Sequence, residues 1–531
     1  MVASFNLVDQ PWIPCLQHNG EGVTLSLRDS FAKAHELVDI AADSPMENAT
    51  LYRFLLAILH RNFGPANSRQ WQELWQADTF PLDTIKEYLT EWYERFDLFS
   101  IEHPFGQFTE DKRVNPKSVV SLKHGFGMLP SGWFDHQVTT EDQLEVRLSP
   151  PEAARDLLTV LAFGFGGLSG IPRISHTDAF CTKGAIFVVQ GDNLKQTLML
   201  NLIRYKHDPF LDNPDAPFWE MENTLELDRT QPFGLLDHYT FPSRSIKLYL
   251  DPQKLEHGDL EVYQYRLGLG LRTNDVLDPM KHYYESNSSG LLPLTFDEDR
   301  QLWRNSSSLL ELNPIGKRPP AIFAWLHTLT EANILNRPML FQCKVLGITK
   351  NRGRADFARQ EQFPLPLSLL TDEQKLAQLK AAIDSVERTN WVLMRALALT
   401  SMHLHLNEPA KFNWKKKHIT HIGAEKDLNQ LKTTEAEVLD WIKYTGVERH
   451  FWSALDVPFL QFMEKLGEAD EEDLLTVKVW WQGEVRESAH NAFRQVLQYT
   501  NQMPRAFKAF AHGNNRLQGY LNKNFPKEKT V

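Results

Sequence analysis

The strongest constraint on the fold is a run of apolar residues with helical spacing in the last third of the chain. Between Glu373 and His403 these residues recur at alternating intervals of three and four. The positions are Leu376, Leu379, Ile383, Val386, Asn390, Leu393 and Leu397, of which only Asn390 is polar. This spacing is typical of the seam of a helical bundle. With further helices expected over residues 433–446, 448–467, 486–502 and 505–522, residues 367–531 are predicted to form a C-terminal helical bundle.

Residues 1–366 show mixed patterns. Helices are expected over residues 46–63 and 83–97, the first with Leu51, Leu55, Leu56 and Leu59 on one face. A buried strand is expected over residues 185–189, followed by a helix over 194–202. Near the N-terminus, a strand over 5–14, an Asn19-Gly20 turn and a return strand over 23–27 form a predicted hairpin, with a helix over 27–37. The predicted fold class is α+β, with a large mixed α/β N-terminal domain over residues 1–366 followed by the helical bundle.

Composition excludes several classes of protein. Cys15, Cys181 and Cys343 lie far apart and form no CxxC pair, so neither a disulfide framework nor a cysteine-rich zinc site is predicted. The N-terminus lacks a basic segment followed by an apolar core, and no apolar run reaches the ~20 residues that span a bilayer. A cytoplasmic location is expected.

A basic turn interrupts the segment from Met339 to Pro366. Residues 340–346 alternate as a strand, residues 349–354 have turn composition, and residues 355–359 are predicted to pair back as the second strand of a hairpin. Its tip consists of Lys350, Asn351, Arg352, Gly353 and Arg354. Three cations within five residues repel one another, and a nucleic-acid backbone would relieve that repulsion. The alternative is a solvated turn. Because the net charge is −11, nucleic-acid contact is expected from such local clusters alone.

Two further segments have a composition that is a candidate for function. Residues 115–150 read as a long loop without clear periodicity, which is uncommon unless it is functional. Residues 163–170, FGFGGLSG, lack both the GxGxxG spacing before a helix and a P-loop lysine, so a nucleotide site is not predicted. Glycines do let backbone N–H groups approach a nucleic-acid strand closely.

Several segments, in order along the chain, resemble one family. They are FNLVDQPWIP (5–14), FDLFSIEHPFGQF (96–108) and GVERHFW (446–452). Together they resemble the large subunit (CasA family) of the type I-E CRISPR surveillance complex, Cascade, an antiviral assembly. By itself, Glu102-His103-Pro104 would suggest acid–base chemistry, but a proline after histidine is better interpreted as an extended turn that buries the flanking aromatic residues.

The resemblance implies a non-catalytic subunit that recognises the protospacer-adjacent motif in double-stranded DNA, starts R-loop formation and helps recruit a helicase-nuclease in trans. Its implied partners are the other Cascade subunits and the guide RNA. The implied motif-binding residues are Phe134, Asp135 and His136 in the long loop, Gly166, Gly167 and Gly170 in the glycine-rich segment, and Lys281 in DPMKHYY. The family's glycines align either with Gly166–Gly170 or with the segment just after, which includes Arg173. The resemblance also implies that the basic hairpin, with Lys350 to Arg354 at its tip, acts as a wedge that separates the first base pairs. Relatives carry Asn and Gln at this tip, where this chain has Asn351, Arg352, Gly353 and Arg354.

A basic path for the displaced DNA strand is expected on the bundle. Its residues are Lys415, Lys416, Lys417, Arg505, Lys508 and Arg516, with Lys523 on the same stripe. The alternative is a solvated helix face. His403 with His405, and His418 with His421, are interpreted as core or surface histidines because no carboxylate accompanies them as a metal ligand would.

An enzyme is the competing class. The sequence contains no HExxH, GxSxG or Walker A motif, and its acid run over residues 468–473 reads as a solvated linker between helices. No catalytic residue, metal or cofactor is therefore predicted. Two alternative functions stay open: the same fold in a transposon-associated Cascade that recruits a transposition factor, and, with less support, a nucleic-acid-processing hydrolase.

Overall fold

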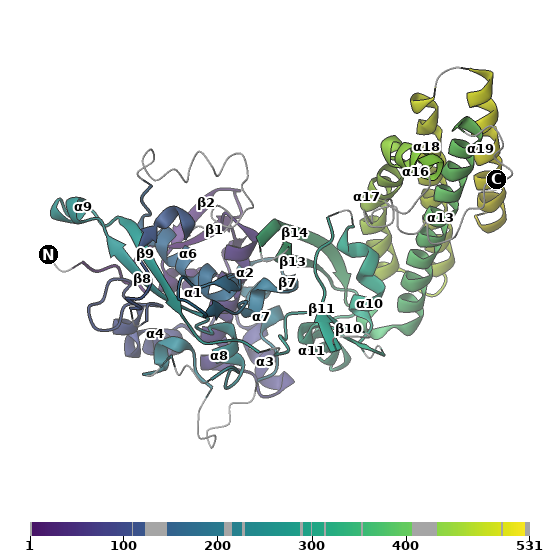
Figure 1. Cartoon of the computed structure of the whole chain (residues 1–531). Coiled ribbons are helices and arrows are strands. Elements are labelled where there is room, and N and C mark those ends of the chain that lie inside the picture. Colours follow the sequence, from purple (N-terminus) through teal and green to yellow (C-terminus); the bar gives the residue numbers. More distant parts are fainter. Residues whose placement is uncertain are drawn as a thin grey trace. The chain divides into compact units, whose positions relative to one another are not determined.

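The structure is a computed structural model that describes residues 3–108, 110–122, 146–205, 215–222, 224–225, 229–274, 276–286, 290–298, 300–312, 315–351, 354–405, 433–500 and 503–525. For residues 350–351, 354–356 and 433–436 it describes the backbone alone. The chain divides into two compact units (Figure 1). The N-terminal unit comprises Met1–Leu302 and Ser308–Leu367, and the C-terminal unit comprises Trp303–Ser307 and Ser368–Val531. The α+β fold class is confirmed.

Helix α2 (Pro45–Phe63) lies at the centre of the N-terminal unit. Ser44 caps it by accepting a hydrogen bond from the Glu47 amide at 3.1 Å. The predicted helix is confirmed, and its burial extends beyond the face that carries the four leucines, because every residue from Met46 to His60 except Glu47 is buried. Other elements of the unit cover the helix on all sides, so its surroundings and not its periodicity decide its burial.

An aromatic cluster packs against α2 and confirms the interpretation of the EHPF turn. Phe105 lies 6.0 Å from Phe54 and 5.5 Å from Phe96 between ring centroids. Glu102 and His103 are exposed, while the side chain of Gln107 is buried and accepts a hydrogen bond from the Leu248 amide at 2.9 Å. The motif therefore holds the core together, and its acid and histidine face solvent.

Three antiparallel strands form the first sheet, in the order β2-β1-β3. They are β1 (Ile13–Gln17), β2 (Gly22–Leu25) and β3 (Leu37–Ile40), and helix α1 (Leu27–Ala32) lies between β2 and β3. The prediction of a strand over 5–14 is wrong for most of its length, because Asn6 accepts from the Val8 amide and turns the chain before Trp12. The predicted helix over 27–37 ends early, and β3 takes its last residue.

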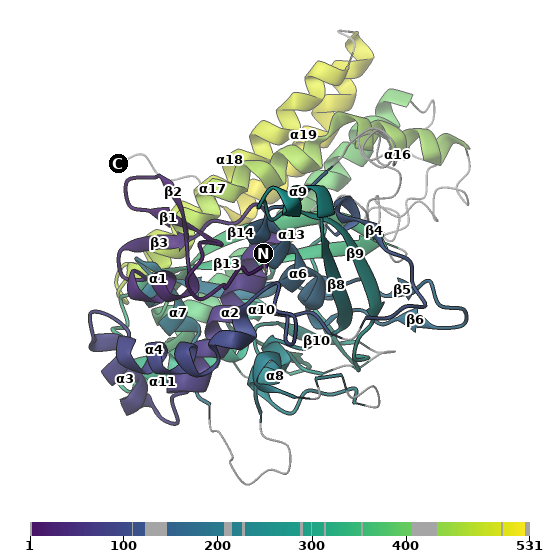
Figure 2. The same cartoon turned by 90° about the vertical axis from the view of Figure 1, so that its left-hand side faces the viewer.

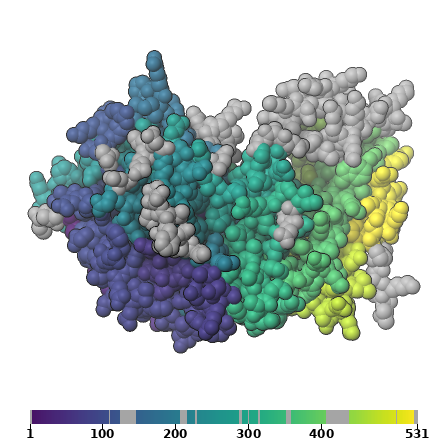
Figure 3. Space-filling view, turned by 90° about the horizontal axis from the view of Figure 1, so that it is seen from below, coloured from purple at the N-terminus to yellow at the C-terminus, as the bar shows by residue number. Residues whose placement is uncertain are grey.

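The sheet that carries the basic hairpin has the order β14-β13-β7. Its strands are β7 (Ile186–Gln190), β13 (Leu340–Asn351) and β14 (Arg354–Pro366). A third sheet has the order β4-β9-β8, with β4 (Lys117–Ser118), β8 (Arg244–Leu250) and β9 (Val262–Leu269). In Figure 3, purple residues from the start of the chain lie directly against teal residues from its middle. Sequence-distant segments therefore build one unit.

The remaining elements of this part of the chain are short. The helices are α3 (Ser68–Gln76), α4 (Leu82–Glu91), α6 (Pro150–Phe163), α7 (Leu194–Asn201), α8 (Leu235–Tyr239), α9 (Pro252–Glu256), α10 (Ser306–Leu310) and α11 (Ala321–Glu331). The strands are β5 (Gly167–Leu168), β6 (Ser175–His176), β10 (Tyr283–Ser286), β11 (Gly290–Pro293) and β12 (Lys317–Arg318). The helix predicted over 83–97 is α4 followed by a 3-10 turn at Tyr93–Phe96.

The C-terminal unit is helical, as predicted. It contains α12 (Ser368–Thr371), α13 (Glu373–His405), α16 (Thr433–Thr445), α17 (Val447–Glu468), α18 (Leu474–Arg494) and α19 (Pro504–Asn524). The apolar seam of α13 is buried except for the half-buried Leu376, and Asn390 donates a hydrogen bond to Glu448 at 2.7 Å. The prediction of a helix over 486–502 is wrong at its start, because α18 begins at Leu474. The side chains of Leu474, Val477 and Trp481 are buried and stabilise its first turns.

Candidate nucleic-acid interface

The basic hairpin forms as predicted. Strands β13 and β14 pair along their length to Asn351↔Arg354, so residues 352 and 353 are the only two between them. Strand β7 pairs with Gln342 to Leu346 alone. Beyond that point, residues 347–351 and 354–359 pair as a two-stranded ribbon. The backbone of Lys350, Asn351 and Arg354 therefore lies at the described end of a ribbon, whereas Arg352 and Gly353 lie outside the described residues. The action of the tip as a wedge stays a prediction.

A buried ion pair anchors the base of this hairpin. The Lys344 Nζ on β13 lies 2.7 Å from the Asp39 Oδ2 on β3, and both side chains are less than a tenth exposed. Tyr52 and Gln190 also donate hydrogen bonds to Asp39. Burial, and then the Asp39 carboxylate, raises the pKa of Tyr52 well above its usual value, so Tyr52 stays a donor. The base is thereby joined to β3, β7 and the central helix α2.

The glycine-rich segment forms a second hairpin, called here the glycine hairpin (residues 164–178). Gly167 pairs with His176 and Leu168 with Ser175. Gly167 and Gly170 have φ angles of 152° and 81°, and Arg173 has a φ of 64° although it is not a glycine. Figure 2 shows the β5–β6 pair projecting from the body of the unit. The predicted glycine loop is thus an ordered hairpin.

Arg244 bridges the two arms of the glycine hairpin from beneath. Its Nη2 donates to the carbonyl oxygens of Phe165 at 2.8 Å and Thr177 at 2.9 Å. The side chain is buried, and this burial, opposed by the charge of Asp178, lowers the pKa of Arg244 to about 10. A Cβ at Gly164 would lie 2.8 Å from Arg244 Nε, so only glycine admits the guanidinium. Asp178 adds a bond, accepting from the Gly166 amide at 2.7 Å.

Lys281 lies inside the N-terminal unit, where only 4% of the residue is exposed. Its Nζ donates to the carbonyl oxygens of Phe180 and Lys183, the latter at 2.6 Å. Burial lowers the pKa of Lys281, and the nearby Asp278 carboxylate opposes that change. Contact between Lys281 and DNA stays a prediction, and it requires the ammonium to leave both carbonyls.

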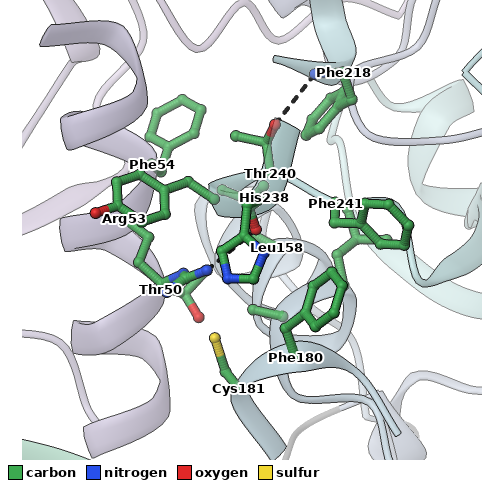
Figure 4. A pocket seen from close by; sticks show the side chains of 13 residues that line it. Thr50, Arg53, Phe54, Leu158, Phe180, Cys181, Phe218, His238, Thr240 and Phe241 are labelled. Atoms are coloured by element: carbon green, nitrogen blue, oxygen red, sulfur yellow. Dashed lines mark hydrogen bonds between the residues drawn. The ribbon is translucent and has the colours of Figure 1, made fainter. Parts of the chain in front are cut away.

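A buried charged cluster supports the segment that carries Lys281. Arg53 Nη1 lies 2.8 Å from Asp278 Oδ2, and His238 Nε2 lies 3.0 Å from the same oxygen. Figure 4 shows Arg53 and His238 facing one another beside Cys181 and the ring of Phe180, around a cavity of about 20 Å³. Burial alone would raise the pKa of Asp278, but the cationic Arg53 and its neighbours hold it well below its usual value.

In the C-terminal unit, the basic stripe lies on one face of α19. Arg505, Lys508, Arg516 and Lys523 are exposed, while Ala509 and Leu517 on the other side of the helix are buried. Arg505 Nε donates to the His403 carbonyl at 3.1 Å, and the rings of His403 and His512 stack at 4.0 Å. His403 is half-buried, between the core and the surface histidine that were the two interpretations. The binding of a DNA strand to the stripe stays a prediction.

Some predicted residues lie outside the described part of the chain. These are Phe134, Asp135, His136, Arg352, Gly353, Lys415, Lys416, Lys417, His418 and His421. Within the described ranges, no three His, Cys, Asp or Glu side chains are grouped to hold a metal ion, and no helix is long and apolar enough to cross a membrane. All three cysteines are free and buried.

Sequence reasoning missed the residues that support the candidate site. Arg53 is the only charged residue between Leu51 and Leu59, and Arg244 follows a proline-containing turn into an apolar strand. A single charge inside an apolar run is a usable signal, because such a charge must find a partner when it is buried. The signal does not name the partner, since Asp278 and Asp39 lie hundreds of residues from Arg53 and Lys344.

The fold places the protein among the CRISPR-associated proteins of known structure. The crystal structure of CasA from Thermus thermophilus is 28% identical, covers 98% of this chain and 100% of that chain, and has a TM-score of 0.76. Thermobifida fusca Cse1 shares the fold at 24% identity, covering 98% of each chain with a TM-score of 0.79. A chain of a "CRISPR RNA-guided surveillance complex" also shares the fold at 18% identity, and the match covers 97% of this chain and 99% of that chain with a TM-score of 0.69.

The sequence comparisons identify the family more specifically than the shared fold does. A profile of the family described as CRISPR-associated protein Cse1 matches residues 6–499. The CRISPR-associated protein CasA/Cse1 of Thermus thermophilus is 31% identical over 525 residues, which is 96% of this chain and 95% of the relative. The chain therefore belongs to the Cse1 (CasA) family, which confirms the resemblance found in its motifs.

Proposed function

We propose that the protein is the non-catalytic large subunit of a type I-E Cascade-like complex, working with the other subunits and a guide RNA. In this role it recognises the protospacer-adjacent motif in double-stranded target DNA and separates the first base pairs beside it. The helical C-terminal unit then helps recruit a helicase-nuclease in trans. Membership of the Cse1 family and a fold shared with a chain of an RNA-guided surveillance complex support this proposal.

One observation supports the strand-separating role: β13 and β14 pair as a ribbon as far as Asn351↔Arg354, and the Lys344–Asp39 ion pair holds the base of that ribbon. Exchange of a DNA duplex for an RNA–DNA heteroduplex is nearly balanced in free energy, and unpairing the first base pairs costs only a few kcal/mol. A rigid element at the motif is therefore sufficient to decide whether strand invasion starts. Arg352 and Arg354 would stack on an unpaired base or hold a phosphate.

Motif recognition is assigned to the N-terminal unit. The glycine hairpin has no side chains at Gly166, Gly167 and Gly170, and a Cβ at Gly167 would meet nothing within 4 Å, which suits close approach to a groove. The loop residues Phe134, Asp135 and His136 and the ammonium of Lys281 complete the proposed contacts. Lys281 would reach acceptors on the floor of the groove, where the pattern of donors and acceptors is degenerate, so recognition would tolerate several motifs.

The test uses the complete complex with guide RNA. Arg352→Ala and Arg354→Ala, alone and combined, should slow R-loop formation on a matched duplex at least tenfold without affecting complex assembly. Arg69→Ala is the matched control, because Arg69 is an arginine with an 87% exposed side chain on helix α3. Unchanged R-loop formation in the double variant would contradict the proposal. The proposal also expects the isolated chain to show no metal-dependent cleavage of DNA.

A further inference from the structure

We propose that Leu168, the last residue of β5 on the glycine hairpin, is an apolar contact to the target duplex that supplies salt-independent affinity. Flanking cations supply the salt-dependent part. The inference rests on the proposed function and deepens it by naming the residue and the kind of contact. Leu168 is 95% exposed, although a leucine side chain is stabilised by leaving water.

Exposure alone carries no argument, because single exposed apolar residues are common on protein surfaces. Leu168 differs from such residues because hydrogen bonds hold the backbone on both sides of it. The side chain of Ser169 is buried and accepts from the Ile171 amide at 3.1 Å, and its Oγ donates to the Ile174 carbonyl at 2.7 Å. Internal bonds therefore hold the turn beyond Leu168, and Arg244 holds both arms below it. Presenting the leucine to a partner costs little ordering entropy.

The surroundings of the hairpin are basic. A Cβ at Gly170 in the turn would lie 3.6 Å from the side chain of Val114, three residues before Lys117 on β4. Lys117 thus lies on the segment that packs against the hairpin. Arg173 lies in the turn of the hairpin, and Arg272 precedes Thr273, whose amide donates to Thr177 Oγ1 at 3.0 Å. All three cations are exposed, and in the described part of the chain none of them makes an ion pair.

Two other arginines nearby, unlike these three cations, form ion pairs. Arg113 pairs with Asp111 at 2.8 Å, and Arg266 pairs with Glu110. In a chain with a net charge of −11, cations that make no ion pair among the described residues, placed around one exposed apolar side chain, favour a polyanion with an accessible apolar interior. Duplex DNA fits that description, because its phosphates line a groove whose walls and floor include sugar and base carbons. Gly167 has open space where a Cβ would stand, so the backbone beside the leucine can approach the groove closely.

The test measures the affinity of the complete complex for motif-containing duplex across a range of salt concentrations. Leu168→Ala should weaken binding roughly tenfold, which corresponds to about 1.4 kcal/mol, by the same factor at every salt concentration. Replacing Lys117, Arg173 and Arg272 together with Ala should lower the slope of log affinity against log salt by about 0.9 for each phosphate no longer neutralised. Ile101→Ala and Ile315→Ala are matched controls, because those residues are 83% and 100% exposed in the same unit.

Three results would overturn the inference: unchanged affinity in Leu168→Ala, an equal loss in the isoleucine controls, or a defect of Leu168→Ala in complex assembly. The last result would assign the leucine to a protein partner. The proposed function fails separately: it is contradicted if the wild-type complex binds and opens duplexes with and without the motif equally well, or if R-loop formation is unchanged in the Arg352 and Arg354 double variant. Leu168→Met, which keeps an apolar side chain, should recover most of the affinity.

Discussion

Lys344 and Asp39, which lie 305 residues apart in the sequence, form a buried ion pair with 2.7 Å between Nζ and Oδ2. The pair joins the strand that leads to the basic tip with the first sheet of the protein. Two charges buried this way are costly to separate, because removal of one leaves the other without a partner in a medium of low dielectric constant. The base of the hairpin should therefore be among the most resistant parts of the N-terminal unit.

Lys344→Met should lower the free energy of unfolding by about 3–5 kcal/mol, because it leaves the Asp39 carboxylate buried and unpaired. Urea unfolding followed by fluorescence measures the effect. Lys254→Met is the control, since Lys254 is about half exposed and its pair with Glu261 spans 3.9 Å, so its loss should change stability by less than about 1 kcal/mol. A combined Asp39→Leu and Lys344→Met variant should recover part of the loss, and equal effects of the two single lysine variants would contradict the account.

Two glycines on helix α19 should respond to alanine in opposite directions. A Cβ at Gly513 would lie 2.1 Å from Thr400 Oγ1 and 2.5 Å from the Ala396 carbonyl, whereas a Cβ at Gly519 would meet nothing within 4 Å. Gly513→Ala should therefore destabilise the helical unit by about 1–3 kcal/mol through overpacking. Gly519→Ala should stabilise it by about 0.5–1 kcal/mol through helix propensity. Thermal unfolding of the two variants side by side measures both signs, and the same sign in both would contradict the close packing of α13 on α19.

The N-terminal unit should lose stability below about pH 6.5 because it buries neutral histidines. Burial lowers the pKa of His60 to about 4 and the pKa of His282 to about 4, whereas a histidine in an unfolded chain titrates near 6.5. Between these values the unfolded state binds protons that the native state does not. The free energy of unfolding therefore falls as the pH falls, by at most about 1.4 kcal/mol per pH unit for each such histidine.

His60→Gln should make the dependence of stability on pH shallower between about pH 6.5 and 4, as measured by urea midpoints at several pH values. His18→Gln is the control, because His18 is exposed, and it should leave the dependence unchanged. Asp278 affects stability in a different pH range. Because the pKa of its carboxyl group is lower in the native state than in the unfolded chain, the carboxylate stabilises the native state above about pH 3.9. This stabilisation is lost as the pH falls below that value toward the native pKa. If the stability of His60→Gln and of the wild type depended on pH with the same slope, the burial of a neutral His60 would be contradicted.

The stripe on α19 should bind the displaced DNA strand through its phosphates. Replacing Arg505, Lys508 and Arg516 together with Ala should lower the affinity of the complex for an R-loop. It should also reduce the salt slope by about 0.7 for each phosphate of the single strand that is no longer neutralised. A control variant with Ala at Lys380, Arg449 and Lys478 removes as many exposed cations from other helices of the same unit. Equal losses in the two triple variants would assign the effect to net charge and not to the stripe.

The sequence predicted what depends on local periodicity and failed where distant residues decide. The seam of α13 and the basic hairpin were predictable, because spacing and turn composition specify them. The start of α18 is not predicted, although Leu474, Val477 and Trp481 have helical spacing, because the acid run before them is typical of a solvated linker. The strand predicted at residues 5–14 failed because the side chain of Asn6 turns the chain.

The candidate site shows the same limit. The positions of the glycine hairpin and of the basic tip follow from the sequence, whereas the burial of Lys281 does not. Nothing near Lys281 in the sequence signals the carbonyls of Phe180 and Lys183, which lie about a hundred residues away. Buried polar groups take whichever partners the tertiary fold supplies, and the sequence pattern does not encode those partners locally.

The most direct test of the strand-separating role compares two DNA targets. One is a fully paired duplex, and the other has the first base pairs beside the motif mismatched so that they are already open. The account predicts that the complex with Arg352→Ala and Arg354→Ala forms R-loops slowly on the paired duplex and at the wild-type rate on the opened one. An equal defect on both targets would contradict it, because the arginines would then serve binding and not the opening of the duplex.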